Sequence, residues 1–469
     1  MKKRRVFWAL GILLLAGGGV AAALFLANRR EVTTSSQAAY EAFQQAQLDR
    51  SRFYFKEARV GYAKALELDP NFAMAMLGVA DLSDRDQAAT LIRRAQRERE
   101  RLTPRERYHV DIAVANLDGK PEKVFAIARE LNAKYPADPV GVSQLVREAL
   151  LRGDRDAAIR FYQEMLAVDP NYSEAYNQIG YYYGYRGDYE RAIDSLEKYR
   201  FISRDNANPF DSLGENQAYS GHYNEAIENL NRALAIKPDF GPAYAHLGVA
   251  YEGMGDYPKA VQMYEKAAAV DDFETDKRGM LKAAARAALN GGDRQKATEL
   301  LDQLEKLPPD PKNDFPNIGK EFAAAIRDLI ENRPAEAERR LIALRPEMDA
   351  AWSTYQKAGK FPPGFKPHFP EWNFGMALAL EKQGKTDEAL ALWEKNANPP
   401  NPFIDFGDRR WIMEARAKVA EILARKGDLD RAEKLIAENR KWNASWAPCR
   451  PSETAVAEAR RARVLAASK

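Results

Sequence analysis

A 34-residue period runs through this sequence from Arg105 to Asp272. Five units, which start at residues 105, 139, 173, 207 and 241, align without a gap. The fifteenth position of every unit is glycine: Gly119, Gly153, Gly187, Gly221 and Gly255. The twentieth position is alanine in all but the first unit: Val124, Ala158, Ala192, Ala226 and Ala260. A fixed period of this length is typical of chains built from stacked copies of one supersecondary unit.

Each unit contains two amphipathic stretches of about a dozen residues, which favours two helices joined by a turn at the glycine. Small residues at the twentieth position, and at the eighth position in Gly180, Gly214 and Gly248, would let the two helices approach closely. Large residues at the twenty-fourth position are expected to fill the groove between neighbouring units: Tyr162, Leu196, Leu230 and Tyr264. One helix pair cannot bury its apolar face alone, so the pairs are predicted to stack into an all-α solenoid.

Two units carry a resemblance to a known family. Ser173–Asp205 (SEAYNQIGYYYGYRGDYERAIDSLEKYRFISRD) and Gly241–Asp271 (GPAYAHLGVAYEGMGDYPKAVQMYEKAAAVD) are both similar to tetratricopeptide repeats. The resemblance implies a right-handed α-solenoid of helix-turn-helix pairs, with a concave groove lined by the first helix of each pair. It also implies a protein that binds other proteins.

Weaker units flank the regular ones. Upstream, one unit is marked by Ala58, Tyr62, Ala65 and Pro70, and a second opens at Leu77 and Gly78. Downstream, twentieth positions fall on Ala297, Ala337, Ala389 and Ala432, and the fifteenth positions are Gly292, Asn332, Gly384 and Gly427. Proline-rich insertions, either plain connectors or loops that fold onto the binding face, separate these later units at Leu307–Pro316, Phe361–Pro370 and Pro399–Phe403. We predict an N-terminal repeat array over 39–272 (most regular over 105–272), divergent helix pairs over 273–441, and an irregular segment with a capping helix over 442–469.

The first thirty residues have a different character. Val6–Ala27 is a run of 22 residues without a charge, long enough at about 1.5 Å per residue to cross a bilayer core of about 30 Å. Four basic residues in the stub 1–5 precede it and Arg29 and Arg30 follow in the linker 28–38, which favours a cytoplasmic N-terminus. We expect a retained transmembrane signal anchor with the solenoid on the extracytoplasmic (periplasmic) side. The alternative is a signal peptide cleaved near Ala21–Ala23, which would release a secreted or periplasmic protein.

Charge and motif content argue against several functional classes. Outside residues 1–30 the chain has 65 basic and 68 acidic side chains, so it lacks the basic body of a nucleic-acid-binding protein. Cys449 is the only cysteine, which excludes an intramolecular disulfide and a CxxC site. The four histidines show no metal-ligand spacing, and the sequence contains neither a GK[ST] phosphate loop nor a G-x-S-x-G nucleophile motif. We therefore predict no enzyme, no cofactor and no metal.

The repeat register predicts a binding groove. In tetratricopeptide repeats the fifth, ninth and thirteenth positions of the first helix face the concave side, and here they supply Ser143, Arg147, Asn177, Tyr181, Tyr185, Asp211, Glu215 and Tyr219. Tyrosine offers wide apolar contact with one hydrogen-bonding tip, as expected of a peptide-binding surface. The alternative is that some of these rings only pack between repeats. No regular unit combines lysine at position five with asparagine at position nine, so the carboxylate clamp that binds chaperone tails is absent.

Together these features predict a membrane-anchored bacterial scaffold that binds partner proteins or peptides at the cell envelope. A signalling adaptor that acts with a membrane-embedded partner shares the same fold and is the alternative. An enzyme with an unrecognised site is the least supported class.

Overall fold

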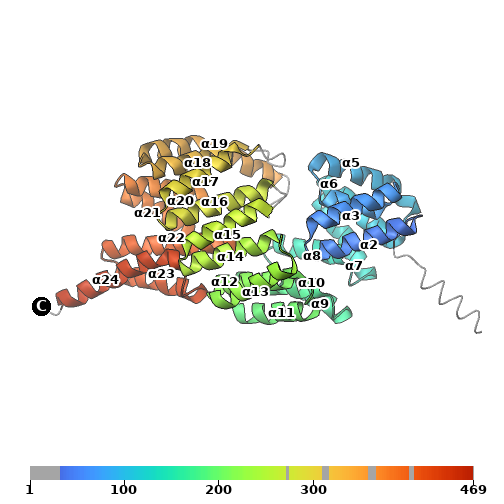
Figure 1. Ribbon diagram of the computed structural model, residues 1–469, viewed down its shortest axis with the longest axis horizontal. Coiled ribbons are helices and arrows are strands. Elements are labelled where there is room, and N and C mark those ends of the chain that lie inside the picture. The colour runs from blue at the N-terminus through green and yellow to red at the C-terminus, as the bar shows by residue number, and fades with distance from the viewer. Residues whose placement is uncertain (1–31, 271–273, 309–315, 358–365, 401–405, 468–469) are drawn as a thin grey trace, which may run out of the picture. The chain divides into compact units, whose positions relative to one another are not determined.

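The computed structural model describes residues 32–270, 274–308, 316–357, 366–400 and 406–467, and its regular secondary structure in those ranges is helical (Figure 1). The predicted anchor, residues 6–27, lies outside the described residues. None of the described helices is both long and apolar enough to cross a membrane. Residues 309–315, 361–365 and 401–403 of the three proline-rich insertions also lie outside the described residues.

Contacts divide the chain into two compact units, residues 1–118 and 119–469. The helices of the first unit are α2 (Gln37–Ser51), α3 (Phe55–Leu68), α4 (Ala73–Asp81), α5 (Arg85–Arg97), the short η1 (Arg99–Arg101) and α6 (Pro104–Leu117). Its core contains an aromatic cluster in which the ring of Phe43 lies 5.7 Å from that of Tyr62 and 4.9 Å from that of Phe72. The end of the predicted linker is fixed to this unit, because the backbone N–H of Thr33 donates to the buried Glu106 carboxylate at 2.7 Å.

The second unit contains the remaining helices, which follow one another as antiparallel neighbours. They are α7 (Pro121–Lys134), α8 (Pro139–Leu151), α9 (Arg155–Val168), α10 (Ser173–Arg186), α11 (Tyr189–Ile202), α12 (Ala207–Ser220), α13 (Tyr223–Ile236), α14 (Gly241–Met254), α15 (Tyr257–Val270), α16 (Glu274–Asn290), α17 (Arg294–Lys306), α18 (Pro316–Ile330), α19 (Pro334–Lys357), α20 (Pro370–Lys382), α21 (Thr386–Ala397), α22 (Phe406–Arg425), α23 (Leu429–Trp442), η2 (Ala447–Cys449) and α24 (Arg450–Ala467). Because α15 packs against α16, the stack continues past the array boundary predicted at residue 272.

Close packing within a pair depends on the small residue at the eighth position. A Cβ atom added to Gly180 would lie 2.6 Å from Cγ of Leu196, and one added to Gly248 would lie 2.5 Å from the Tyr264 ring. Gly214 and Leu230 repeat this arrangement, again at 2.6 Å. The large twenty-fourth residues therefore press onto the first helix of their own pair. Leu196 also belongs to a core cluster with Leu213 of the next pair, which agrees with its predicted place between neighbouring units.

The predicted turns are confirmed. Every glycine at a fifteenth position has a left-handed backbone: Gly119, Gly153, Gly187, Gly221, Gly255, Gly292, Gly384 and Gly427. Asn332 takes the same conformation with φ of 60°, and asparagine is the non-glycine residue that most readily does so. The corresponding position of the first pair is Phe53, whose φ of 63° is unusual for a bulky side chain.

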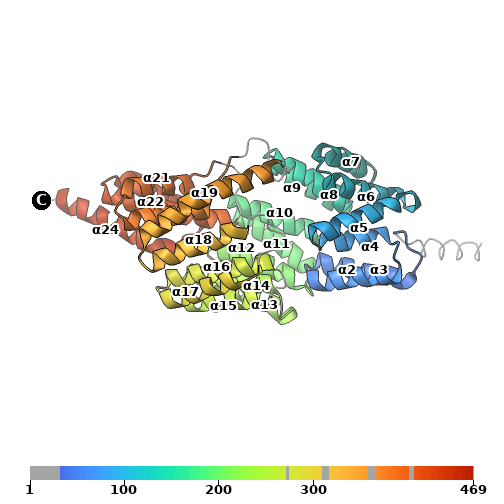
Figure 2. The same ribbon diagram turned by 90° about the horizontal axis from the view of Figure 1, so that it is seen from above.

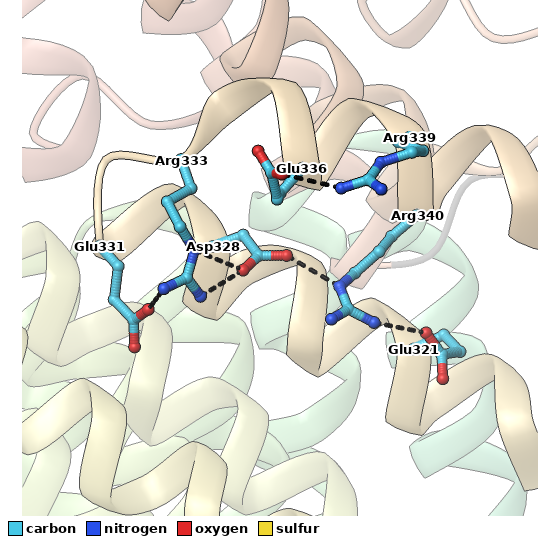
Figure 3. Close-up of polar contacts among 7 residues, drawn as sticks. All are labelled: Glu321, Asp328, Glu331, Arg333, Glu336, Arg339 and Arg340. Carbon is cyan, nitrogen blue, oxygen red and sulfur yellow. Dashed lines mark hydrogen bonds and ion pairs between the residues drawn. The ribbon is translucent and has the colours of Figure 1, made fainter.

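An ion network supports the Asn332 turn (Figure 3). The buried Asp328 carboxylate accepts hydrogen bonds from Nε of Arg333 at 3.0 Å and from Nε of Arg340 at 2.8 Å. The backbone N–H of Arg333 also donates to the Asp328 carbonyl at 2.7 Å. Burial acts to raise the pKa of Asp328, but the two arginines outweigh it and hold that pKa below its usual value. Asp328 therefore stays ionised and joins α18 to α19.

The first helices of successive pairs contact one another directly. Contacts of this kind join α10 to α12, α12 to α14, α18 to α20 and α20 to α22. We call the surface formed by α8, α10, α12, α14, α16, α18, α20 and α22 the first-helix face. It is the surface on which the sequence placed the binding groove.

Candidate functional site

The eight predicted groove residues lie on α8, α10 and α12 and differ widely in exposure. Ser143 is exposed, and Arg147, Tyr181, Tyr185, Glu215 and Tyr219 are partly buried. Asn177 and Asp211, both at the fifth position, are only 2% exposed. In these two units the fifth-position side chain is therefore mostly enclosed between helices, and the ninth and thirteenth positions retain more contact with solvent.

Part of this set forms a polar row across three successive first helices. The hydroxyl of Tyr181 on α10 donates to Oε2 of Glu215 on α12 at 2.5 Å. Glu215 Oε1 lies 3.3 Å from Nε2 of His246 on α14. Nδ1 of the same histidine lies 2.8 Å from Oδ1 of Asp211. The His246 imidazole thus bridges the carboxylates of Asp211 and Glu215, and Glu215 links it to Tyr181.

The electrostatics of the polar row favour a protonated histidine. Burial alone would lower the pKa of His246, but the charges of Asp211 and Glu215 together raise that pKa well above its usual value. Burial also acts to raise the pKa of Glu215, and His246 and Tyr181 reverse this effect and lower it. The pKa of Asp211 is raised because burial outweighs the attraction of the imidazolium. The row therefore combines an imidazolium with carboxylate on adjacent helices.

The sequence did not single out His246. The sequence showed only that the four histidines lack metal-ligand spacing, whereas the His246 side chain is 18% exposed and has a carboxylate at each ring nitrogen. A usable signal was present, because the preceding unit places acidic residues at its fifth and ninth positions. A histidine at the sixth position of the next unit then lies between them.

A second buried ion cluster lies further along the first-helix face. Arg286 on α16 donates through Nη2 to Oε2 of Glu252 on α14 at 2.8 Å. The same Glu252 oxygen accepts from the Tyr264 hydroxyl at 3.0 Å, and Glu414 on α22 lies 3.5 Å from Arg286. Glu252 is fully buried. Glu252 and Arg286 are 34 residues apart, one repeat period, so they occupy equivalent positions on successive first helices. Glu414 comes from a helix far away in sequence, and no repeat pattern could have predicted its place in this cluster.

The later helices also contact the ends of the earlier first helices, and in Figure 1 the C-terminal end of α23 (red) lies by α12 (green). Arg409 donates to the carbonyl oxygens of Gly184, at 3.0 Å, and Tyr185. Asn443 donates to the carbonyl of Tyr219 at 3.2 Å. Arg450 donates to the carbonyl of Met254 at 3.4 Å. These carbonyls belong to the last turns of α10, α12 and α14, where the regular donors four residues further on are missing, and the Gly184 carbonyl also accepts from the backbone N–H of Gly187 at 2.9 Å.

A cavity of about 470 Å³ opens on the first-helix face between α16, α17, α18, α20 and α22. Most of its lining is apolar, and several cationic side chains lie among the lining residues. The predicted groove, centred on residues 139–272, did not include it. Its walls come from the divergent pairs, in which the repeat register was too weak to assign inward-facing positions.

The arrangement can bind and hold charged or aromatic groups, and the polar row contains a protonated base beside carboxylates. Within the described ranges, no cluster of three or more histidine, cysteine, aspartate or glutamate side chains could hold a metal ion. Cys449 is buried, and burial raises the pKa of its thiol well above the usual value.

Three segments match family models for this kind of repeat. Residues 161–194 and 243–276 match models described as tetratricopeptide repeat, and residues 217–255 match one described as TPR repeat. Among curated proteins, none matches the sequence.

Solved structures also resemble parts of the chain. A crystal structure of MamA is 28% identical over 35% of this chain and 87% of its own, with a TM-score of 0.29. MamA from Desulfovibrio magneticus RS-1 (residues 41 to the end) is 23% identical over 35% of this chain and 92% of its own, with a TM-score of 0.30. The hetero-tetramer of Cut9 and Hcn1 from the APC/C is 12% identical over 95% of this chain and 81% of its own, with a TM-score of 0.46. The family models and the helix pairs together establish that this chain contains tetratricopeptide repeats.

Proposed function

We propose that this chain is a non-catalytic scaffold that binds partner proteins or peptides on its first-helix face and is held at a membrane of the cell envelope by residues 6–27. The observation that carries the binding proposal is the alignment of Tyr181, Glu215 and His246 across three successive first helices. An extended partner that crosses these helices would meet one polar or aromatic side chain per repeat. Repeat solenoids typically bind along such extended surfaces.

Partly exposed tyrosines extend this surface beyond the polar row. The ring of Tyr185 lies 5.8 Å from that of Tyr181, and Tyr219 occupies the equivalent position on the next first helix. Aromatic side chains of this kind contribute much of the binding energy at protein interfaces. The partner that fits best therefore has apolar side chains that pack on Tyr185 and Tyr219.

Site-specific photo-crosslinking of the full-length protein in its native cells tests the binding proposal. A photoreactive residue replaces Ser143, which is exposed on α8, or Phe201, which is 81% exposed on the second helix α11 and serves as the matched control. We expect a discrete set of adducts from position 143 that disappears when Tyr181→Ala and Tyr219→Ala are combined. Equal adducts from positions 143 and 201, or adducts that survive the double substitution, would refute the groove.

The membrane proposal rests on the uncharged run Val6–Ala27 between two basic segments. Alkaline extraction of cell membranes tests it. The full chain should stay with the membrane pellet at its full mass, and a chain without residues 1–30 should be extracted. A shorter, soluble mature chain would instead indicate signal-peptide cleavage.

A further inference from the structure

The cavity lined by α16, α17, α18, α20 and α22 has the size and the apolar lining of a small-molecule site. Figure 2 shows α16, α17 and α18 side by side, and α20 and α22 complete the enclosure. The apolar lining includes Leu301, Leu304, Phe322, Ile326, Phe374 and Trp411. A volume of about 470 Å³ lies within the range of small-molecule sites, which are mostly apolar with a few placed polar groups.

The charged residues of the lining are almost all of one sign. Five of them are cations, Lys282, Arg286, Arg294, Lys382 and Arg410, and Glu371 is the one acidic residue among the described lining residues. Glu371 lies 3.2 Å from Lys282, and Arg286 is matched by Glu252 and Glu414. These three carboxylates offset three of the five cations and leave an excess of two positive charges, and Arg410 also lies within electrostatic range of Glu414.

Arg410 has unused hydrogen-bonding capacity. Its Nε atom is buried and has no hydrogen-bond partner among the described residues. A buried donor without an acceptor is unfavourable, so a ligand that accepts from this guanidinium would gain affinity. Carboxylate suits this role because its two oxygens match the geometry of a guanidinium.

The lining is poorly suited to a peptide backbone. A bound peptide presents both N–H donors and C=O acceptors, which need partners when buried. The described lining residues include no serine, threonine, asparagine, glutamine or tyrosine, and the Glu371 carboxylate already faces Lys282. A ligand with an apolar chain and one anionic end needs only apolar walls and cations, and the cavity provides both.

We propose that this cavity binds a long-chain carboxylate of the fatty-acid type, with its alkyl chain among the apolar side chains and its carboxylate at Arg410. Burial of the alkyl chain supplies most of the affinity, and the cation selects the charge of the ligand. This inference stands independently of partner binding, because it rests on residues outside the polar row.

Two helical glycines provide a matched pair of variants. Gly279 lines the cavity, and a Cβ atom added there has no atom within 4 Å. Gly319 on α18 has equally open surroundings but does not line the cavity. Gly279→Leu should therefore fill part of the cavity without a clash, and Gly319→Leu adds the same side chain elsewhere. Both changes remove a glycine from a helix, which favours folding.

The test is photolabelling of the full chain in lipid nanodiscs with a diazirine analogue of hexadecanoate, followed by peptide mapping. We expect adducts on α16, α18 and α20 that excess dodecanoate suppresses and that dodecyltrimethylammonium, which has the same chain and the opposite charge, does not. Gly279→Leu should reduce these adducts about tenfold or more, and Gly319→Leu should leave them unchanged. Labelling confined to other segments, equal competition by both amphiphiles, or adducts unaffected by Gly279→Leu would each overturn the proposal.

Loss of the guanidinium tests the carboxylate position separately. Arg410→Met keeps the length and apolar packing of the side chain but loses its charge and its donors, and Lys382→Met, which removes a cation from another part of the lining, is its control. Arg410→Met should raise the dodecanoate concentration needed for half-suppression about threefold to tenfold, and Lys382→Met should leave it unchanged. The same concentration for both variants would place the carboxylate elsewhere and refute the assignment to Arg410.

Discussion

Arg409 on α22 donates a hydrogen bond of 3.0 Å to the carbonyl oxygen of Gly184 on α10, although 225 residues separate them in the chain. The guanidinium also lies over the ring of Trp442, 4.9 Å from its centroid. Trp442 in turn lies close to the Gly187 turn, where an added Cβ would be 3.3 Å from its ring. Asn443 and Arg450 make equivalent contacts at the ends of the next two first helices. The later helices of the second unit thus cap three earlier repeats.

Removal of this cap should destabilise the second unit. Arg409→Met keeps the length and apolar packing of the side chain but loses its donors, and we expect a decrease of about 2–3 kcal/mol in the free energy of unfolding. Hydrogen exchange should quicken in both α22 and the last turn of α10. The control is Arg425→Met on the same helix, where the side chain is 61% exposed and a change within about 0.5 kcal/mol is expected. Faster exchange in α22 alone would contradict a direct link to α10.

The Gly221 turn gives a second test of the cap. Both Gly221 and Gly384 have left-handed backbones, with φ of 89° and 75°, so alanine at either should cost about 1 kcal/mol. A Cβ at Gly221 would also lie 2.9 Å from Oδ1 of Asn443, whereas one at Gly384 meets no atom within 4 Å. In chemical denaturation, Gly221→Ala should therefore lower the free energy of unfolding by about 1 kcal/mol or more beyond the decrease caused by Gly384→Ala. Equal losses would mean that Asn443 moves aside freely.

The local part of this structure was predictable because it repeats. A left-handed turn needs glycine or asparagine, so the fifteenth position identifies every turn from Gly119 to Gly427, including the one at Asn332. Close helix packing needs small residues, so Gly180 and Ala192 mark where the two helices of a pair approach, although the contact of Leu196 with Gly180 was not predicted. These constraints act within about 34 residues, which is the period of the sequence.

Contacts between distant repeats left no such signal. Arg409 and Asn443 each occur once and bind backbone carbonyls, which every residue offers, so nothing in the side chains at Gly184 or Tyr219 indicates them. The cavity also could not be predicted, because its walls come from divergent pairs whose inward-facing positions the repeat register did not assign. Of the predicted groove, the sequence supplied Tyr181 and Glu215 but not His246, which joins them to Asp211.

The polar row should make stability depend on pH through His246. Its pKa is raised in the folded state, so the stabilisation it provides is fully present below its ordinary pKa of 6.5 and is lost as pH rises through the folded value. His246→Gln keeps one hydrogen bond but not the charge, and should cost about 1–3 kcal/mol at pH 6. This cost should shrink in alkaline solution. The exposed His222 provides the control, because His222→Gln should change stability little at either pH. A cost for His246→Gln that grows with pH would contradict a protonated histidine.

The Asp328 network predicts the opposite pH dependence (Figure 3). Arg333 and Arg340 lower the pKa of Asp328 in the folded state, so its contribution is present above the ordinary value of 3.8 and is lost as pH falls through the folded value. Both arginines are nearly half exposed, at 49% and 45%, so solvent screens the pairs and Asp328→Asn should cost about 1–2 kcal/mol at neutral pH. The exposed pair of Arg345 and Asp349 on α19 supplies the control, and Asp349→Asn should cost at most about 0.5 kcal/mol. Urea denaturation at pH 7 and pH 3 compares them. If the difference in free energy of unfolding between wild type and Asp328→Asn does not decrease at pH 3, the ionised carboxylate is not what holds α18 to α19. The backbone hydrogen bond from Arg333 to Asp328 would then be sufficient to hold the turn.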